Sequence, residues 1–130
     1  MSQRTLLATI VGALVLFVLG FLVYGMALAD YFAGQGIETL DEPILWAIFL
    51  GELAMAALLT FIFVQWASIS TFAGGFKGGA IVGGLVTIAF GMIQIGAMGA
   101  NFAPIVVDLV ISVVRVGLAG GAIGAMLGRK

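Results

Sequence analysis

The run LLATIVGALVLFVLGFLVYGMALA, residues 6–29, decides the fold class of this chain. It contains no charged residue, and it exceeds the ~20 apolar residues that an α-helix needs to cross ~30 Å of hydrocarbon. Arg4 precedes the run, as a basic residue precedes the apolar core of a secretory signal peptide. The apolar core of a signal peptide, however, has only roughly 7 to 15 residues. We therefore expect a retained transmembrane helix.

Three further apolar stretches of similar length follow the first one. Together they predict helices over residues 5–29, 43–66, 78–100 and 104–127. Pro43 and Pro104 stand where the second and fourth helices should begin, since a first helical turn tolerates a missing N–H. We expect an all-α fold, a four-transmembrane-helix bundle with short connections that forms a single domain over residues 1–130.

Composition excludes several classes of function. Hydrophobic residues make up 63% of the 130 residues and charged residues only 8%, against ~25% charged in soluble domains. The net charge of -1 provides no basic surface, so we expect the lipid bilayer and no nucleic acid as a partner. The chain has no cysteine and no histidine, which removes thiolate sites, the commonest metal ligand and the usual general base. We expect no catalytic residues, no metal, no cofactor and no enzymatic activity.

Basic residues flank the predicted helices on one side only, at Arg4, Lys77, Arg129 and Lys130. The connection between the first two helices carries only acidic residues, namely Asp30, Glu38, Asp41 and Glu42. Lysine and arginine accumulate in cytoplasmic loops of membrane proteins. This distribution predicts that both termini face the cytoplasm and that the acidic connection faces outward.

Glycine predicts where the last two helices meet. The third helix has small residues at a four-residue spacing, at Gly75, Gly79, Gly83, Thr87 and Gly91. The fourth helix carries Gly117 and Gly121, with Gly120, Gly124 and Gly128 on the adjoining face. Such faces let two backbones approach closely, so we expect the antiparallel helices to pack in the inner half of the bilayer. Packing within the chain is favoured over a dimer seam or a mobile gate.

Three ionisable residues stand inside the apolar blocks: Glu52, Asp108 and Arg115. Each would cost roughly 2.5 to 3.5 kcal/mol if it faced lipid at mid-bilayer, so they should face the bundle interior. Counting along the helices places Glu52 and Arg115 within ~3 Å of the same depth. We expect the two to contact each other, with Gln94 as an amide partner and Asp108 about two turns nearer the outer surface.

Three short motifs resemble a family of small four-helix bacterial membrane proteins that is defined only as a domain of unknown function. They are residues 17–25 (FVLGFLVYG), residues 71–79 (TFAGGFKGG), and Val107-Asp108 followed by residues 120–124 (GGAIG). The resemblance implies a four-helix fold and a bacterial source. With four apolar spans, we then expect a multi-pass protein of the bacterial cytoplasmic (inner) membrane. The resemblance implies no activity.

Two interpretations of function are left open at this point. The first is a non-enzymatic protein that acts by helix association, as a homo-oligomer or as an accessory subunit of a membrane complex. The alternative is a small channel or carrier for an ion, a proton or a solute, with a polar site around Glu52 and Arg115. In the first interpretation the pair of Glu52 and Arg115 fixes the register of the helices. In the second it forms part of a binding site for the solute.

Overall fold

The computed structural model describes residues 3–23, 31, 44–99 and 102–128. These residues form helices and contain no strand. The elements are α1 (Gln3–Gly20), α3 (Leu45–Ile62) with the short π-helix η2 (Phe63–Ala67) at its end, α4 (Phe72–Met98) and α5 (Phe102–Leu127). Four helices are long and apolar enough to cross a membrane, the first extending to Val23 and the second through η2. The predicted all-α bundle of four membrane-spanning helices is confirmed.

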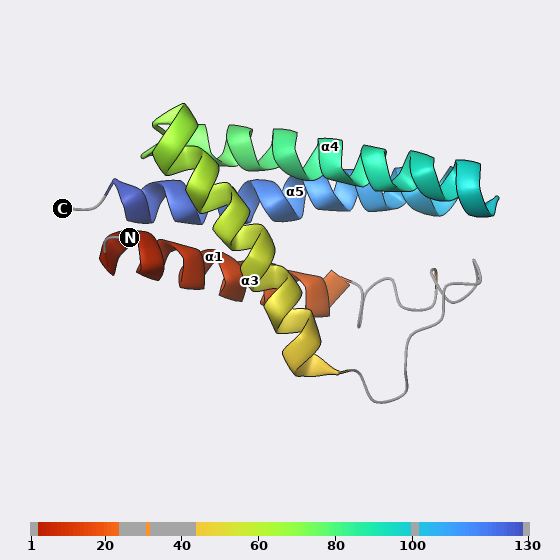
Figure 1. Cartoon of the computed structure of the whole chain (residues 1–130), viewed down its shortest axis with the longest axis horizontal. Coiled ribbons are helices and arrows are strands. Elements are labelled where there is room, and N and C mark those ends of the chain that lie inside the picture. The colour runs from red at the N-terminus through yellow and green to blue at the C-terminus, as the bar shows by residue number, and fades with distance from the viewer. Residues whose placement is uncertain (1–2, 24–30, 32–43, 100–101, 129–130) are drawn as a thin grey trace.

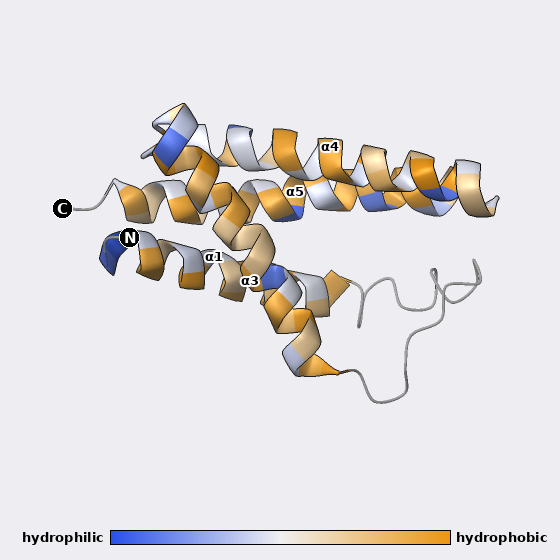
Figure 2. Ribbon diagram, in the orientation of Figure 1, coloured by the Kyte–Doolittle hydropathy of each residue, from blue (hydrophilic) through white to orange (hydrophobic). Residues whose placement is uncertain are grey.

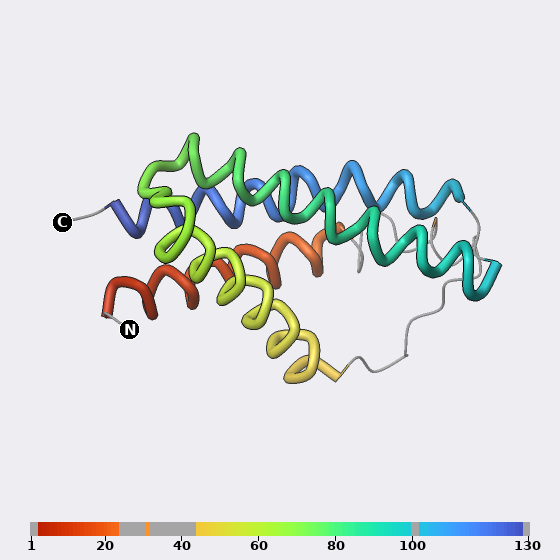
Figure 3. Tube along the Cα trace, turned by 45° about the horizontal axis from the view of Figure 1, so that its top comes forward, coloured from red at the N-terminus to blue at the C-terminus, as the bar shows by residue number. Residues whose placement is uncertain are grey.

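The four helices are not packed equally. α4 and α5 lie side by side over their length, α1 packs along α5, and α3 crosses obliquely over α1 towards the start of α4 (Figures 1 and 3). Side chains from α1, α3, η2 and α5 form the buried core, namely Ala8, Ala13, Leu16, Ala56, Leu59, Phe63, Val116, Ala119 and Ile123. The outward surfaces are mostly apolar (Figure 2), as expected of a protein whose solvent is lipid.

The observed helix ends differ from the predicted ones in the third and fourth helices. α4 begins at Phe72 and not at Gly78, because the Thr71 hydroxyl accepts a hydrogen bond from the Gly74 N–H at 3.0 Å and caps the helix. Lys77 is therefore an exposed helical residue and not part of a connection. α5 begins at Phe102, which leaves Pro104 in the first turn. The predicted end at residue 29 and the predicted start at residue 43 lie outside the described residues.

The connection between the second and third spans is short, and it determines where α3 can go. η2 is followed by Ser68, which has a left-handed backbone (φ 52°), and the Ile69 N–H donates to the Phe63 carbonyl at 3.1 Å. Because α4 begins a few residues later at Phe72, one end of α3 is tied to the start of α4. From that end α3 diverges from α4 (Figure 3).

The glycines of α4 are used in packing against α5. A Cβ on Gly75 would run into the backbone of Gly120, and a Cβ on Gly79 would run into the Val116 carbonyl. A Cβ on Gly124 would likewise run into the Thr71 carbonyl. These positions are filled by backbone of the same chain, so the predicted small faces meet within the protein.

The remaining predicted packing glycines accommodate side chains. Gly117 and Gly121 lie under the rings of Phe76 and Phe72, while Gly83 and Gly91 lie against Val116 and Ile105, respectively. The fourth-helix face that meets the α4 backbone is thus the one with Gly120 and Gly124, and the neighbouring face with Gly117 and Gly121 accommodates two phenylalanine rings. Backbone-to-backbone contact is therefore concentrated in the half of the hairpin next to Thr71.

We expect Gly75→Ala to destabilise the protein by about 1 to 3 kcal/mol, because the new methyl group meets a carbonyl that cannot rotate away. Gly96→Ala is the matched control, since a Cβ there meets nothing within 4 Å and alanine favours the helix. Thermal unfolding in one detergent should show a loss for Gly75→Ala and no loss for Gly96→Ala. Equal stability of the two variants would mean that the helices do not touch at Gly75.

The Gln3 end of α1 and the Leu127 end of α5 lie at the same end of the bundle (Figure 1). The charge distribution predicts that this end faces the cytoplasm. Since the chain has no native cysteine, Ser70→Cys should react with a membrane-impermeant thiol reagent only in inverted vesicles and Met98→Cys only in intact cells. Labelling of both from one side would contradict the topology.

Candidate functional site

An ion pair between α3 and α5 lies inside the bundle. Nη1 of Arg115 donates to both carboxylate oxygens of Glu52, at 3.1 Å each. The Arg115 and Glu52 side chains are only 16% and 17% exposed. Arg115 stands near the middle of α5, which runs from Phe102 to Leu127. The pair therefore lies far from either end of its span. An unpaired charge costs most at this middle depth of a membrane.

α1 completes the environment of the pair. Nη1 of Arg115 also donates to the backbone carbonyl of Leu16 at 3.1 Å. A Cβ on Gly20 would stand 3.3 Å from this nitrogen and 3.8 Å from Oε1 of Glu52. One guanidinium thus connects three helices, and Gly20 provides the space in which the two charged groups meet.

Sequence reasoning did not identify Leu16 or Gly20 as part of the site. Leu16 contributes a backbone oxygen, which every residue type has, so its identity carries no signal. Gly20 did carry a signal, a small residue within a run of large apolar ones, but its role depends on which helix approaches it.

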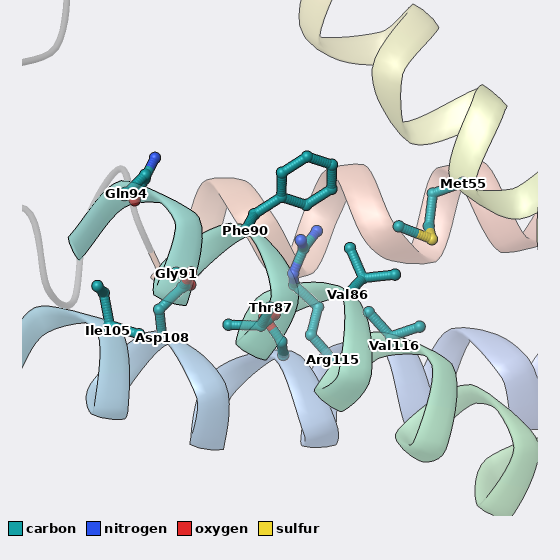
Figure 4. A pocket seen from close by; sticks show the side chains of 12 residues that line it. Met55, Val86, Thr87, Phe90, Gly91, Gln94, Ile105, Asp108, Arg115 and Val116 are labelled. Carbon is teal, nitrogen blue, oxygen red and sulfur yellow. The ribbon is translucent and has the colours of Figure 1, made fainter. Parts of the chain in front are cut away.

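A pocket of about 430 Å³ lies beside the pair, between α3, α4 and α5. Its polar lining consists of Arg115, Asp108 and Ser112 from α5 and of Thr87 and Gln94 from α4. Apolar side chains form the remainder, among them Met55, Val86, Phe90, Ile105 and Val116. Figure 4 shows the Arg115 side chain extending away from α5, with Asp108 farther along the same helix, beside Gly91 of α4. The pocket thus lies between a guanidinium and a carboxylate.

The structure places Arg115, Asp108 and Gln94 in the lining of one pocket, and Glu52 binds Arg115. Asp108 is half-buried and lines the same pocket as Arg115. Gln94 also lines it, but it is exposed, and within the described residues it makes no hydrogen bond to Glu52 or Arg115. The predicted amide contact is wrong because Gln94 lies about one turn beyond Gly91, which packs against Ile105, whereas Val116, next to Arg115, packs against Gly83. Gln94 and Arg115 therefore lie at different depths along the hairpin.

Thr87 and Ser112 are pocket residues that the sequence did not single out as polar-site residues. The sequence indicates Thr87 only as a small residue of the packing face. A usable signal exists, since Ser112 lies between Asp108 and Arg115 at spacings of four and three residues, which place all three on one helical face.

The chemistry that this arrangement supports is the binding of charged or polar species. No group of three acidic, cysteine or histidine side chains able to hold a metal occurs among the described residues. A guanidinium and a carboxylate in a low-dielectric pocket act strongly on charge. Hydroxyl and amide groups beside them can exchange hydrogen bonds with a bound molecule.

We expect Glu52→Gln or Arg115→Met alone to cost about 3 to 5 kcal/mol, because either change leaves one buried charge without its partner. The double variant should recover a large part of that loss, since it removes both charges together. Thermal stability in detergent, measured for all four proteins, gives the coupling energy. Additive losses would show that the pair contributes no coupling.

Comparisons of the chain with protein-family models, with curated proteins and with solved structures return no significant match. The resemblance to a four-helix bacterial family therefore stays a prediction. The ion pair and the pocket beside it are the features of the described residues that bear on function.

Proposed function

We propose that this protein is a small non-enzymatic channel or carrier, which binds an ion or a small polar solute inside the cytoplasmic membrane of a bacterium. One observation carries the proposal: a pocket of about 430 Å³, lined by Asp108 and Arg115, extends from the ion pair near the middle of α5 towards the Phe102 end of that helix. Ionisable groups within a membrane are costly, and they commonly mark substrate or ion pathways.

The packing of the glycines supports this function over association through glycine faces. A dimer seam would need small faces that are open to a second molecule. The faces of Gly75, Gly79 and Gly124 are instead covered by backbone of the same chain. The glycine faces, which in the sequence most favoured association with another molecule, are therefore used up in the contact between α4 and α5.

The unequal packing of the helices supports a moving site. α4 and α5 share a long contact, whereas α3 makes little contact with α4. Met55 of α3 lines the pocket opposite residues of α4 and α5. A small displacement of α3 about its tied end would change the width of the pocket and leave the hairpin intact, as in hinge motions about element ends.

Association with another membrane protein is the second candidate, because large side chains are exposed along one side of α4. Ile81, Leu85, Ile88 and Met92 follow each other at helical spacing and are all exposed. Lipid alone can cover such a stripe, and a partner helix, from a second copy or from another subunit of a membrane complex, can cover it equally well.

Water-soluble reagents should reach the pocket if it serves polar solutes. In the cysteine-free chain, we expect Thr87→Cys, inside the pocket, to react with a membrane-impermeant methanethiosulfonate reagent in proteoliposomes. Leu85→Cys is the matched control, because it lies at nearly the same depth of α4, is exposed on the outside of the bundle, and does not line the pocket. We expect it to stay unmodified in lipid.

Reaction rates for the two variants decide the proposal. Rapid modification at residue 87 with none at residue 85 supports a pocket that is connected to water. An unreactive Thr87→Cys that is modified after detergent unfolding would show that the pocket is closed to water, and the proposed function would then be wrong.

A further inference from the structure

Building on the proposed function, we propose that the pocket is reached from one side of the membrane only, and that Phe63 is the gate residue that closes it towards the other side. The bundle has a Thr71 end, where α1 and α4 begin and α5 ends, and a Met98 end, where α4 ends (Figure 1). The juxtaposition that carries the inference is a buried phenylalanine ring at the joint between α3 and α4, between the pocket and the Thr71 end.

The pocket extends from the middle of the bundle towards the Met98 end. Along α4 its lining runs from Gly83 to Gln94, and no described residue of α4 before Gly83 lines it. Gln94 is exposed and lies about one turn before the end of α4. α3 diverges from α4 in the same direction (Figure 3). The lining therefore reaches exposed side chains on the side of the Met98 end.

On the other side of the pocket, contacts between the described helices close the space. α4 and α5 meet backbone to backbone, since a Cβ on Gly79 would run into the Val116 carbonyl. α1, α3 and α5 meet where a Cβ on Gly12 would run into the Ile123 side chain and would stand 3.4 Å from the Ala56 methyl group. Ile123 and Ala56 are fully buried. Two of the three gaps between helices are thus filled.

Phe63 fills the third gap, which lies between α3 and α4. A Cβ on Gly78 of α4 would stand 2.9 Å from Cε1 of the Phe63 ring, and it would stand 3.0 Å from the end of the Ile69 side chain. Phe63 is only 1% exposed. Gly78 lies between the start of α4 and the first α4 residue of the pocket lining. A solute that entered between α3 and α4 from the Thr71 end would therefore meet the ring before it reached the pocket.

Phe63 also lies at the joint on which α3 can turn. It is the first residue of η2, and its carbonyl accepts hydrogen bonds from the N–H groups of Ser68 and Ile69. Single π-helical turns within α-helices occur frequently at functional sites. A rotation at this joint would carry the ring away from Gly78, as in hinge motions about element ends.

Of the three closures, the one at Phe63 is best suited to open. The contact of Gly79 with Val116 joins two backbones, so it cannot open unless α4 and α5 separate along their length. The Phe63 closure depends on one side chain that can swing with its helix. An apolar side chain at a constriction also excludes water until it moves, which is how hydrophobic gates in channels work.

Sidedness is measured with Thr87→Cys as the reporter inside the pocket of the cysteine-free chain. A membrane-impermeant thiol reagent is applied to intact cells and to inverted vesicles. Ser70→Cys and Met98→Cys identify which preparation exposes which end, so the test does not depend on the topology. We expect Thr87→Cys to react from the Met98 side, and about tenfold or more slowly from the Thr71 side, because an apolar constriction stays dry.

Phe63→Ser tests the gate residue, because it removes the ring and adds a hydroxyl group that binds water. In the Thr87→Cys background it should raise the rate from the Thr71 side about tenfold or more and leave the rate from the Met98 side unaltered. Phe61→Ser is the matched control, since Phe61 lies two residues away and is 47% exposed on the outside of the bundle. We expect it to change neither rate.

Phe63→Leu decides the role of Phe63 if Phe63→Ser does not fold. Leucine keeps the core apolar but is shorter than the ring, so the rate from the Thr71 side should rise by a smaller factor. An unaltered rate in every Phe63 variant that folds would overturn the role of Phe63.

The outcomes separate this inference from the proposed function. Equal rates from the two sides with Phe63 in place, or reaction from the Thr71 side alone, would overturn the inference and keep a pocket that is open to water. No reaction from either side would overturn the proposed function, and the inference that rests on it.

Discussion

Close contact between the backbones of α4 and α5 is the constraint on which the rest of the structure depends. Gly75 and Gly120 approach so closely that neither position has space for a side chain, and Gly79 meets the Val116 carbonyl in the same way. This contact sets the register of the two helices. The register in turn brings Thr87 of α4 and Ser112 of α5 to the same pocket.

The ion pair connects the other two helices to this hairpin. Arg115 extends from α5, and its Nη1 binds Glu52 of α3 and the Leu16 carbonyl of α1. A buried threonine pair supports the same arrangement nearer the start of α1, where Thr9 and Thr60 hydroxyls lie 3.0 Å apart. Polar contacts of this kind specify which helices meet, because hydrocarbon offers no alternative hydrogen-bond partner.

The pocket results from two constraints on the position of α3. The short connection between η2 and α4 keeps one end of α3 beside α4, while the ion pair draws the middle of α3 towards α1 and α5. α3 must therefore cross the bundle at an angle, and the space that it leaves beside α4 and α5 contains Asp108.

The sequence by itself determined that the chain crosses a membrane as four helices, that Glu52 and Arg115 lie inside and at one depth, and that glycine faces pack within the chain. The first two depend on position along a helix axis, through hydropathy over a span and the cost of charge in hydrocarbon. The third depends on a four-residue spacing that places small residues on one helix face. Tertiary structure decided the part played by Gly20 and the Leu16 carbonyl and the separation of Gln94 from the pair. These depend on the register of α4 against α5 and on the oblique path of α3, which are set only when the helices pack together.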